Sequence, residues 1–432
     1  MPSVAFQTLG CKVNQYDTQA MLECFERAGY DVRPFDETAD VYVINTCTVT
    51  GTGDRKSMNA VRRAQRRNPS ADIVIAGCLA QRDGESLLST GARLIIGANR
   101  RAEVVELLET AQREQRQTVA VGDILRVPFE RLRVSGDEGR TRAVMKIQEG
   151  CDRYCTYCII PYVRGGIRSR PLEDIRDEAL RLRGAGYREL VLTGIHLTSY
   201  GRDLGGADLA DAIEAAAASG VERLRLGSLE PVIATRAFID RIRAVPALCP
   251  QFHLALQSGS DAVLRRMRRR YTSAEFTAAA QRLTEAFPGC ALTTDIITGF
   301  PGETDEDFRQ TCELVRKVGF ARIHVFPYSA RKGTPAAAMP DQLPKAVREE
   351  RARELIAVGH EAASHWAGSQ IGRIRPVLIE DSENGFMRGY TPEYAAVLLP
   401  KAASGSLMDV RLDRWTGDAF MGSCASPDSV IE

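Results

Sequence analysis

The chain has 432 residues, of which 44% are hydrophobic and 26% charged, and its formal net charge is +1. This composition is typical of a globular protein of several domains, since domains usually run to roughly 100–200 residues. It excludes a polycation, so an anionic partner must be bound by local patches of charge. No apolar run approaches the ~18 residues of a membrane span and no export signal is evident, so we expect no membrane partner.

Residues 1–110 alternate short apolar runs with helical stretches. The pattern predicts strands at Val4–Leu9, Val41–Asn45 and Ile73–Ala76, with helices at Asn14–Ala28 and Asp54–Arg67 between them. Such alternation is typical of a parallel sheet covered by helices. We therefore expect a Rossmann-like α/β domain.

Three of the eleven cysteines, Cys11, Cys47 and Cys78, each come directly after one of these strands. Because ligands of open α/β sheets gather beyond the carboxyl ends of the strands, we expect the three thiols to converge. They would then be metal ligands that hold an iron–sulfur cluster with one open iron. The alternative is three unrelated buried cysteines, since cysteine is often a small core residue.

The number and spacing of the cysteines favour a reducing cytoplasm and metal or catalytic thiols over disulfides. We interpret the five cysteines that lack a partner pattern as structural; these are Cys24, Cys249, Cys290, Cys312 and Cys424. Residues 111–117 are polar and residues 135–140 are charged and contain glycine, and these two runs bracket the segment 111–140. This stretch predicts a surface linker.

Residues 141–368 alternate strands and helices six times. The predicted strands are Ala143–Gln148, Glu189–Leu192, Arg223–Leu226, Phe252–Leu256, Leu292–Ile297 and Arg322–Phe326. Six such units predict a partial (βα)6 barrel, whose active face lies at the carboxyl ends of its strands.

Cys151, Cys155 and Cys158 follow the first of these strands at the spacing C-x₃-C-x₂-C. Three thiolates hold three irons of a [4Fe–4S] cluster, where four are normally needed, and the fourth iron stays open to a small molecule. The amino and carboxylate groups of S-adenosylmethionine (SAM) can chelate such an iron. A zinc knuckle is the alternative, but it usually needs four ligands in paired Cys-x₂-Cys groups. The spacing, with Tyr157 before the last cysteine, resembles that of radical SAM enzymes.

Polar residues follow the other predicted strands, and they resemble the SAM contacts of the radical SAM fold. These cofactor-binding candidates are Gly194, Ser228, Glu230, Gln257 and Asp295, together with Tyr157. His196, His253 and His324 also lie near strand ends, where a histidine could move protons. We favour a structural role for them and assign them no function.

Arginines gather in three groups, and arginine both pairs with phosphate and stacks on bases. We expect RNA contact from the group beside the cluster motif, which is Arg164, Arg168 and Arg170. The other two groups, at 62–67 and 265–270, are as well explained by solvated helix faces. Residues 369–432 alternate with a period of two, which predicts a small β-barrel similar to the TRAM domain. Arg388 and Tyr390 are its candidates for RNA contact, with a structural cap as the alternative.

Three runs carry a resemblance that covers nearly the whole chain. Gly10-Cys11-Lys12-Val13-Asn14-Gln15-Tyr16, Asn45-Thr46-Cys47 and Gly77-Cys78-Leu79-Ala80-Gln81, together with the Cys151 motif, resemble the radical SAM methylthiotransferases. The first run resembles the branch that acts on N6-threonylcarbamoyladenosine at position 37 of tRNA, next to the anticodon. The resemblance implies two [4Fe–4S] clusters, SAM, the tRNA anticodon loop and an electron donor such as flavodoxin or ferredoxin, but no DNA.

The resemblance also implies a mechanism. The Cys151, Cys155 and Cys158 cluster reduces SAM, the resulting 5′-deoxyadenosyl radical removes hydrogen from C2 of the base, and the second cluster presents methylated sulfur. Alternative substrates are isopentenyladenosine of tRNA and a ribosomal-protein aspartate. An alternative of another class is a non-catalytic iron–sulfur protein that binds RNA.

Overall fold

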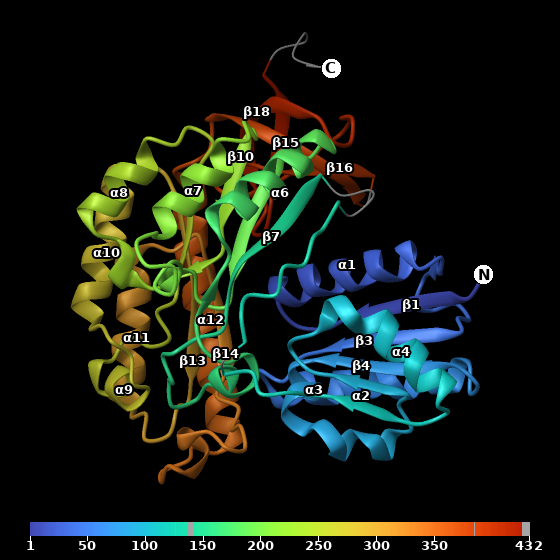
Figure 1. The fold of residues 1–432 in the computed structure, drawn as a ribbon. Coiled ribbons are helices and arrows are strands. Elements are labelled where there is room, and N and C mark those ends of the chain that lie inside the picture. Colours follow the sequence, from blue (N-terminus) through green and yellow to red (C-terminus); the bar gives the residue numbers. More distant parts are fainter. Residues whose placement is uncertain (126, 137–140, 384, 426–432) are drawn as a thin grey trace.

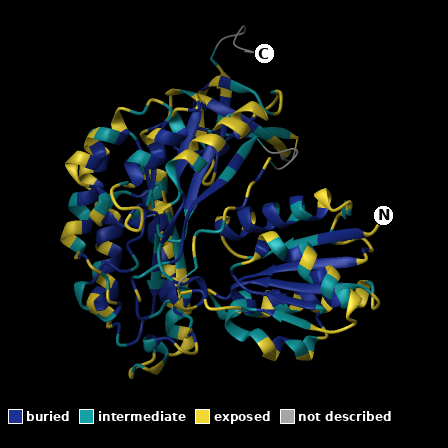
Figure 2. Cartoon of the chain, in the orientation of Figure 1, coloured by how far each residue is buried: buried dark blue, intermediate teal, exposed yellow. Residues whose placement is uncertain are grey.

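The structure is a computed structural model that describes residues 1–125, 127–136, 141–383 and 385–425. The chain folds into an N-terminal α/β domain, a central partial barrel and a C-terminal β-barrel (Figure 1). Buried residues fill the sheet of each part, and exposed residues lie mainly on the outer helices and loops (Figure 2). The predicted fold class is confirmed. No helix among the described residues is long and apolar enough to cross a bilayer.

The N-terminal domain is a six-stranded parallel sheet with the order β2-β1-β3-β4-β5-β6. Its strands are β1 (Ser3–Thr8), β2 (Asp31–Arg33), β3 (Val41–Thr46), β4 (Asp72–Gly77), β5 (Leu94–Ile96) and β6 (Thr118–Ala120). Helices α1 (Lys12–Arg27) and α4 (Val104–Arg113) pack on one face, where Phe25 and Leu108 are buried. Helices α2 (Gly51–Arg67) and α3 (Cys78–Asp83) pack on the other, where Ala64 and Leu79 are buried. Two 3₁₀ turns, η1 (Gly84–Thr90) and η2 (Arg101–Glu103), complete the domain.

The N-terminal sheet extends beyond the predicted boundary at residue 110. Strand β6 pairs in parallel with β5, so that Thr118 lies opposite Leu94. A three-residue strand between polar segments leaves too short a pattern to be found in the sequence. Further along the predicted linker, Leu132 and Val134 are buried against Tyr16 and Ala20. The part of that linker at 137–140 lies outside the described residues.

The central domain contains the six predicted strands and two further short ones, β8 and β11, in two four-stranded sheets of order β10-β9-β7-β8 and β11-β12-β13-β14. The strands are β7 (Arg142–Glu149), β8 (Arg168–Ser169), β9 (Glu189–Gly194), β10 (Arg223–Leu226), β11 (Ser228–Leu229), β12 (Gln251–Leu254), β13 (Ala291–Thr298) and β14 (Arg322–Pro327). Its α-helices are α5 (Ile160–Arg164), α6 (Leu172–Gly184), α7 (Leu209–Ala217), α8 (Arg236–Arg243), α9 (Asp261–Arg266), α10 (Ser273–Ala286), α11 (Asp305–Val318) and α12 (Lys345–Gly368). Shorter 3₁₀ turns are η3 (Leu197–Ser199), η4 (Pro231–Ile233) and η5 (Pro335–Ala338). Because the strands other than β8 run parallel, their carboxyl ends face one side.

The C-terminal segment forms a closed barrel with the order β15-β16-β17-β19-β18. Its strands are β15 (Ile374–Glu383), β16 (Phe386–Tyr390), β17 (Ala396–Leu399), β18 (Leu407–Trp415) and β19 (Phe420–Cys424). Residue 384, between β15 and β16, lies outside the described residues. The buried interior includes Val377, Val397 and Phe420.

Candidate iron–sulfur and S-adenosylmethionine sites

The three N-terminal cysteines lie at the carboxyl edge of the first sheet. Cys11 is the N-cap of α1, Cys47 directly follows β3, and Cys78 is the first residue of α3. Gly10, with φ +106°, lets the Cys11 loop touch Cys47, since a Cβ there would stand 2.9 Å from the Cys47 sulfur. The thiols of Cys11 and Cys47 each interact electrostatically with that of Cys78. The cysteines that the sequence separates are therefore neighbours in the fold.

Two of these thiols are buried and the third is exposed, and we call the solvent-side space next to the exposed Cys11 the recess. Burial raises the pKa of Cys47 to about 11 and also raises the pKa of Cys11. Cys11 nevertheless keeps an exposed surface, whereas Cys47 and Cys78 are buried. A thiol that is surrounded by protein and still accessible can meet a small molecule or a base that enters the recess.

Arg164 connects the N-terminal cysteines to the central domain. Its Nε donates a hydrogen bond to the Cys78 sulfur at 3.1 Å, and its guanidinium pairs with Asp17 at 2.9 Å and with Glu149 at 3.1 Å. The side chain is fully buried. An iron–sulfur cluster is held by thiolates, and a buried guanidinium beside the sulfur would offset their negative charge. The donor set and its charge thus fit an iron–sulfur cluster.

The structure contradicts the RNA contact that we predicted for three arginines. The side chains of Arg164, Arg168 and Arg170 are all buried. Arg168 donates to the carbonyl oxygens of Ile124 at 3.1 Å and of Arg164 at 2.9 Å, and Arg170 pairs with Glu178 at 2.6 Å. Their donors are used within the protein, so these residues position the two domains and do not reach a phosphate. Sequence spacing alone does not distinguish a buried ion pair from a basic patch.

The partners of Arg164 belong to a buried ionic network that the sequence prediction missed. Asp17 of α1 also pairs with Lys146 of β7 and with Arg101 at 3.2 Å, and Lys146 reaches Glu149 at 3.1 Å. The positive charges around Asp17 outweigh the effect of burial and lower the pKa of its carboxyl. A usable signal was present in the sequence, since a lysine inside an apolar strand is almost never buried unless it is paired.

The second cysteine motif forms a tight loop after β7. Gly150, with φ +73°, has no room for a side chain, because a Cβ would stand 1.7 Å from the Gly166 carbonyl oxygen. Its neighbour Cys151 donates its backbone N–H to the Gly165 carbonyl at 2.9 Å, and Cys158 donates to the Cys155 carbonyl at 2.9 Å. Burial raises the pKa of Cys151 to about 11 and that of Cys158 to about 12. The thiols of Cys151 and Cys158 both interact electrostatically with Cys155.

The two cysteine motifs meet where the domains pack together. Cys78 shares one buried apolar cluster with Ile159 and Val163, and Ile159 is the residue that follows Cys158. A second contact joins the domains beside Cys47, where Arg331 donates to the Thr48 hydroxyl at 2.7 Å. Both cysteine motifs therefore lie at one domain interface.

Among the described residues, no three His, Cys, Asp or Glu side chains surround a single point closely enough to hold one metal ion. A four-iron cluster makes a different demand, because each of its thiolates binds a different iron. Three separated thiols that border a common space are compatible with that arrangement. We therefore regard each motif as a candidate cluster site and not as a mononuclear metal site.

Glu230 is the charged centre of the candidate SAM site. It lies within 3.0 Å of Arg153, 3.1 Å of Arg269 and 3.1 Å of His196. Burial by itself would raise the pKa of Glu230, but the close approach of His196 and the charges of Arg269 and Arg153 lower it to about 2. Arg269 also donates to the Cys155 sulfur at 3.3 Å. This carboxylate is thus linked to the cluster motif through one arginine.

Replacing Glu230 by Gln is expected to destabilise the protein by ~3 kcal/mol at pH 7, because it leaves buried cations without their carboxylate. The pKa of Glu230 is lowered in the folded state, so its contribution is present above its ordinary pKa and is lost as pH falls toward 2. Thermal unfolding at pH 7 and at pH 3 measures the difference, which should shrink at the lower pH. The matched control is the exposed Glu214→Gln, whose pairing with Arg241 is worth less than ~1 kcal/mol. Equal shifts in the two variants would contradict this role of Glu230.

The remaining predicted SAM contacts lie at or near the carboxyl ends of the barrel strands. Gly194 ends β9, and a Cβ there would stand 2.8 Å from Cβ of Gln148, so strand packing already requires glycine. Ser228 is exposed, and Gln257 is half-buried and adopts φ +67°. Asp295 lies 3.4 Å from His253.

Tyr157, the last of the predicted SAM contacts, lies beside an aromatic cluster. Its ring packs edge-on against that of Phe300 at 6.5 Å. Phe300 in turn packs against Tyr328, whose buried hydroxyl has no hydrogen-bond partner among the described residues. An unpartnered hydroxyl beside an aromatic cluster fits a site that awaits a polar ligand. His324 lies opposite Asp295 in the sheet, and burial lowers the pKa of its imidazole.

Arg388 and Tyr390 lie at the junction between the barrel and the central domain. The Tyr390 ring stacks on Tyr394 at 4.8 Å, and the Arg142 guanidinium lies 4.9 Å from both rings. Arg388 lies over Tyr390 at 5.7 Å. These surfaces are engaged in contacts within the chain, so they support a structural role, the alternative to RNA contact.

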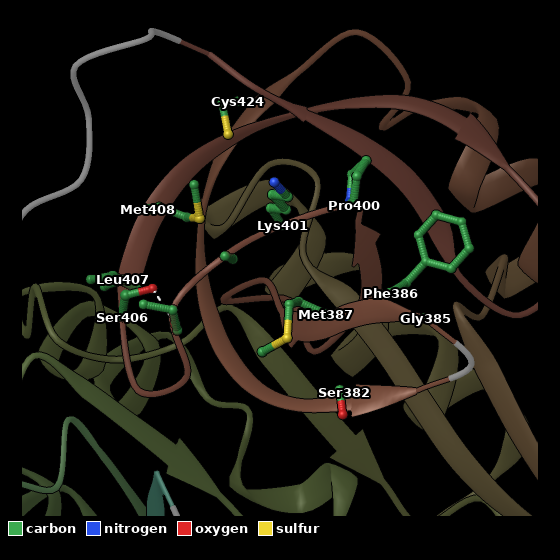
Figure 3. A pocket seen from close by; sticks show the side chains of 12 residues that line it. Ser382, Gly385, Phe386, Met387, Pro400, Lys401, Ser406, Leu407, Met408 and Cys424 are labelled. Carbon is green, nitrogen blue, oxygen red and sulfur yellow. Dashed lines mark hydrogen bonds between the residues drawn. The ribbon is translucent and has the colours of Figure 1, made fainter.

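The C-terminal barrel also holds an apolar pocket of about 590 Å³ (Figure 3). Met387, Met408, Phe386 and Lys401 are among the residues that line it. It contains no convergent set of titratable groups, which a reactive site requires. We therefore place the candidate chemistry at the two cysteine motifs.

Comparison with known families agrees with this division of the chain. Residues 3–97 match a family described as "Uncharacterized protein family UPF0004", and residues 145–315 match the radical SAM superfamily. Among solved structures, the radical SAM methyltransferase TsrM from Kitasatospora setae has a TM-score of 0.55 at 14% identity and covers 78% of this chain and 74% of its own. At this identity the likeness concerns the fold alone. The central domain is thus that of a radical SAM enzyme.

Curated relatives define the family more narrowly. The threonylcarbamoyladenosine tRNA methylthiotransferase MtaB of Bacillus subtilis is 41% identical over 92% of this chain and 90% of its own length. That of Thermotoga maritima is 37% identical over 91% of this chain and 90% of its own. The tRNA-2-methylthio-N(6)-dimethylallyladenosine synthase of Pelotomaculum thermopropionicum is 35% identical over 88% of each chain. The chain belongs to the radical SAM methylthiotransferase family.

Proposed function

We propose that this protein transfers a methylthio group to C2 of N6-threonylcarbamoyladenosine at position 37 of tRNA. The observation that carries the proposal is the buried apolar cluster that Cys78 shares with Ile159, next to Cys158, since it supports one interface for both cysteine motifs. Hydrogen abstraction and sulfur insertion at the same carbon require the two centres to border one space. Four relatives named for threonylcarbamoyladenosine match the chain at 35–41% identity, and four dimethylallyladenosine synthases at 31–36%.

The six cysteines of the two motifs would form two separate centres. Cys151, Cys155 and Cys158 would hold one [4Fe–4S] cluster, and Cys11, Cys47 and Cys78 would hold a second. When bound, the first cluster supplies the electron that cleaves SAM. Glu230 and its cations orient the polar end of SAM, while Gln257, Asp295, Ser228 and Gly194 border the same face. The accessible Cys11 faces the recess, and the packed interface excludes water from the reacting carbon.

The protein's partners follow from this activity. The substrate base must be splayed out of its loop to reach the recess, which recognition of an anticodon loop permits. An electron must come from a small donor protein such as flavodoxin or ferredoxin. A tRNA substrate and a reducible cluster both support a cytoplasmic location.

The experiment is mass spectrometry of tRNA nucleosides from a strain that lacks the gene. We expect the 2-methylthio derivative of N6-threonylcarbamoyladenosine to disappear and to return when the gene is restored. Loss of the 2-methylthio derivative of isopentenyladenosine, or of methylthiolated ribosomal-protein aspartate, would assign one of the sister activities. If the reconstituted protein forms no 5′-deoxyadenosine from SAM with dithionite, the non-catalytic RNA-binding alternative holds.

A further inference from the structure

Helix α2 carries a cluster of cations on the surface of the N-terminal domain. Six exposed basic side chains lie within thirteen residues of this helix; they are Arg55, Lys56, Arg62, Arg63, Arg66 and Arg67. The apolar side of the same helix packs on the sheet through Ala60, Val61 and Ala64. The helix is therefore held in place, and its charged side faces outward.

These cations are not neutralised by the protein. Arg55 donates to Thr52, Arg62 to Asn59 and Arg63 to Gln7, and all three partners are uncharged. In the part of the chain that the structure describes, no carboxylate lies within ion-pair distance of any of the six.

Some exposed arginines on other helices are paired with carboxylates. Arg241 on α8 pairs with Asp208, Asp211 and Glu214, and Arg309 on α11 pairs with Glu306 and Glu313. The whole chain has a net charge of only +1. The α2 cluster is thus a local excess of positive charge and not a reflection of overall composition.

The cations line a concave surface and not a flat one. A groove of about 760 Å³ runs between α2 and the end of β1, and its lining includes Lys56, Arg62, Arg63 and Arg66. Leu9, two residues before Cys11, forms part of the opposite wall. One end of the groove therefore adjoins the loop that carries the accessible cysteine.

We propose that this α2 groove binds the phosphodiester backbone of the RNA substrate. The inference rests on the proposed function, because it takes the substrate to be tRNA. Arginines pair with phosphates in a bidentate manner, and a basic groove that follows a nucleic acid backbone needs no sequence-specific contacts. A strand held here runs past Leu9, so that a base splayed from it enters the recess at Cys11. An acidic donor protein fits the position less well, since an electron must reach the Cys151 motif.

The test uses the reconstituted full-length protein and a fluorescent anticodon stem-loop that contains N6-threonylcarbamoyladenosine. Binding is measured by anisotropy from about 50 to 200 mM KCl for wild type and for the triple variant Arg62→Gln, Arg63→Gln, Arg66→Gln. Each lost phosphate contact lowers the salt slope by ~0.7–0.9, so we expect the slope to fall by about 2–3 and the affinity at ~100 mM KCl to fall at least tenfold. Iron content and the unfolding temperature show whether the variant is folded.

The matched control removes three arginines that have carboxylate partners, by Arg241→Gln, Arg309→Gln and Arg316→Gln. It lowers the net charge equally and should leave the salt slope within about 0.5 of wild type. Equal slopes for the groove variant and wild type would overturn the proposal, as would an unchanged RNA affinity with weakened binding of flavodoxin. A different result would show that the proposed function is wrong: the wild type would bind the RNA but form no methylthio product from it.

Discussion

Replacing Cys47 by Ala is expected to stop methylthio transfer while 5′-deoxyadenosine formation continues. The variant should lose methylthio transfer by more than about a hundredfold, because loss of a cluster ligand exceeds the usual effect of an outer-shell change. Formation of 5′-deoxyadenosine from SAM should stay within about twofold of wild type, since Glu230 and the Cys151 motif lie on the central domain. Both products can be measured by liquid chromatography and mass spectrometry in one reconstituted reaction.

The control for this variant is Cys312→Ala. Cys312 is equally buried, lies on α11 and belongs to neither motif, so both products should be unchanged. Cys151→Ala provides the opposite case, in which 5′-deoxyadenosine formation should also vanish. A Cys47→Ala enzyme that still transfers the methylthio group would remove the N-terminal cysteines from the mechanism.

Replacing Arg164 by Met is expected to give the largest loss of stability. The change leaves Asp17 and Glu149 buried with one fewer cation, and breaking such a buried pair typically costs about 3–5 kcal/mol. The charges around these carboxyls hold their pKa values below the ordinary range, so the network stabilises the fold above the ordinary carboxyl pKa. That contribution is lost as pH falls below it. Urea unfolding at pH 7 and pH 4 measures the effect.

The exposed pair of Arg309 and Glu306 provides the comparison, since Arg309→Met breaks only a solvent-exposed ion pair and should leave the stability nearly unchanged. Arg164→Met should also alter the reduction potential of the N-terminal cluster, because hydrogen bonds to cluster sulfurs set that potential. A shift in potential without loss of stability would mean that the two carboxylates are satisfied without Arg164. No change in either quantity would exclude Arg164 from the interface described here.

The sequence was most informative where a short-range pattern carries the structure. Hydrophobic alternation located the strands that end at Cys11, Cys47 and Cys78, and the sheet geometry then brings their ends to one edge. The three predicted strands differ from β1, β3 and β4 by at most one residue at either end. The same reasoning placed Glu230 at the barrel face.

What the sequence could not show depends on partners that are distant along the chain. In the sequence, Arg164 resembles part of a basic patch. In the structure it pairs with Asp17, which is 147 residues away along the chain. Tyr390 resembles an RNA-stacking residue until Tyr394 and Arg142 are placed on its ring. Conversely, the arginines of α2 resemble an ordinary solvated face in the sequence. The structure shows that three of them line a groove and that none has a carboxylate partner among the residues it describes.

The most direct test of the central claim is the iron content of the anaerobically reconstituted chain, measured together with its Mössbauer spectrum. Two [4Fe–4S] clusters predict about eight irons per wild-type chain, and about four in each of two triple-Ala variants. One variant replaces Cys11, Cys47 and Cys78, and the other replaces Cys151, Cys155 and Cys158. About four irons in the wild type, unchanged by loss of the N-terminal cysteines, would contradict a second cluster and with it the proposed insertion of sulfur.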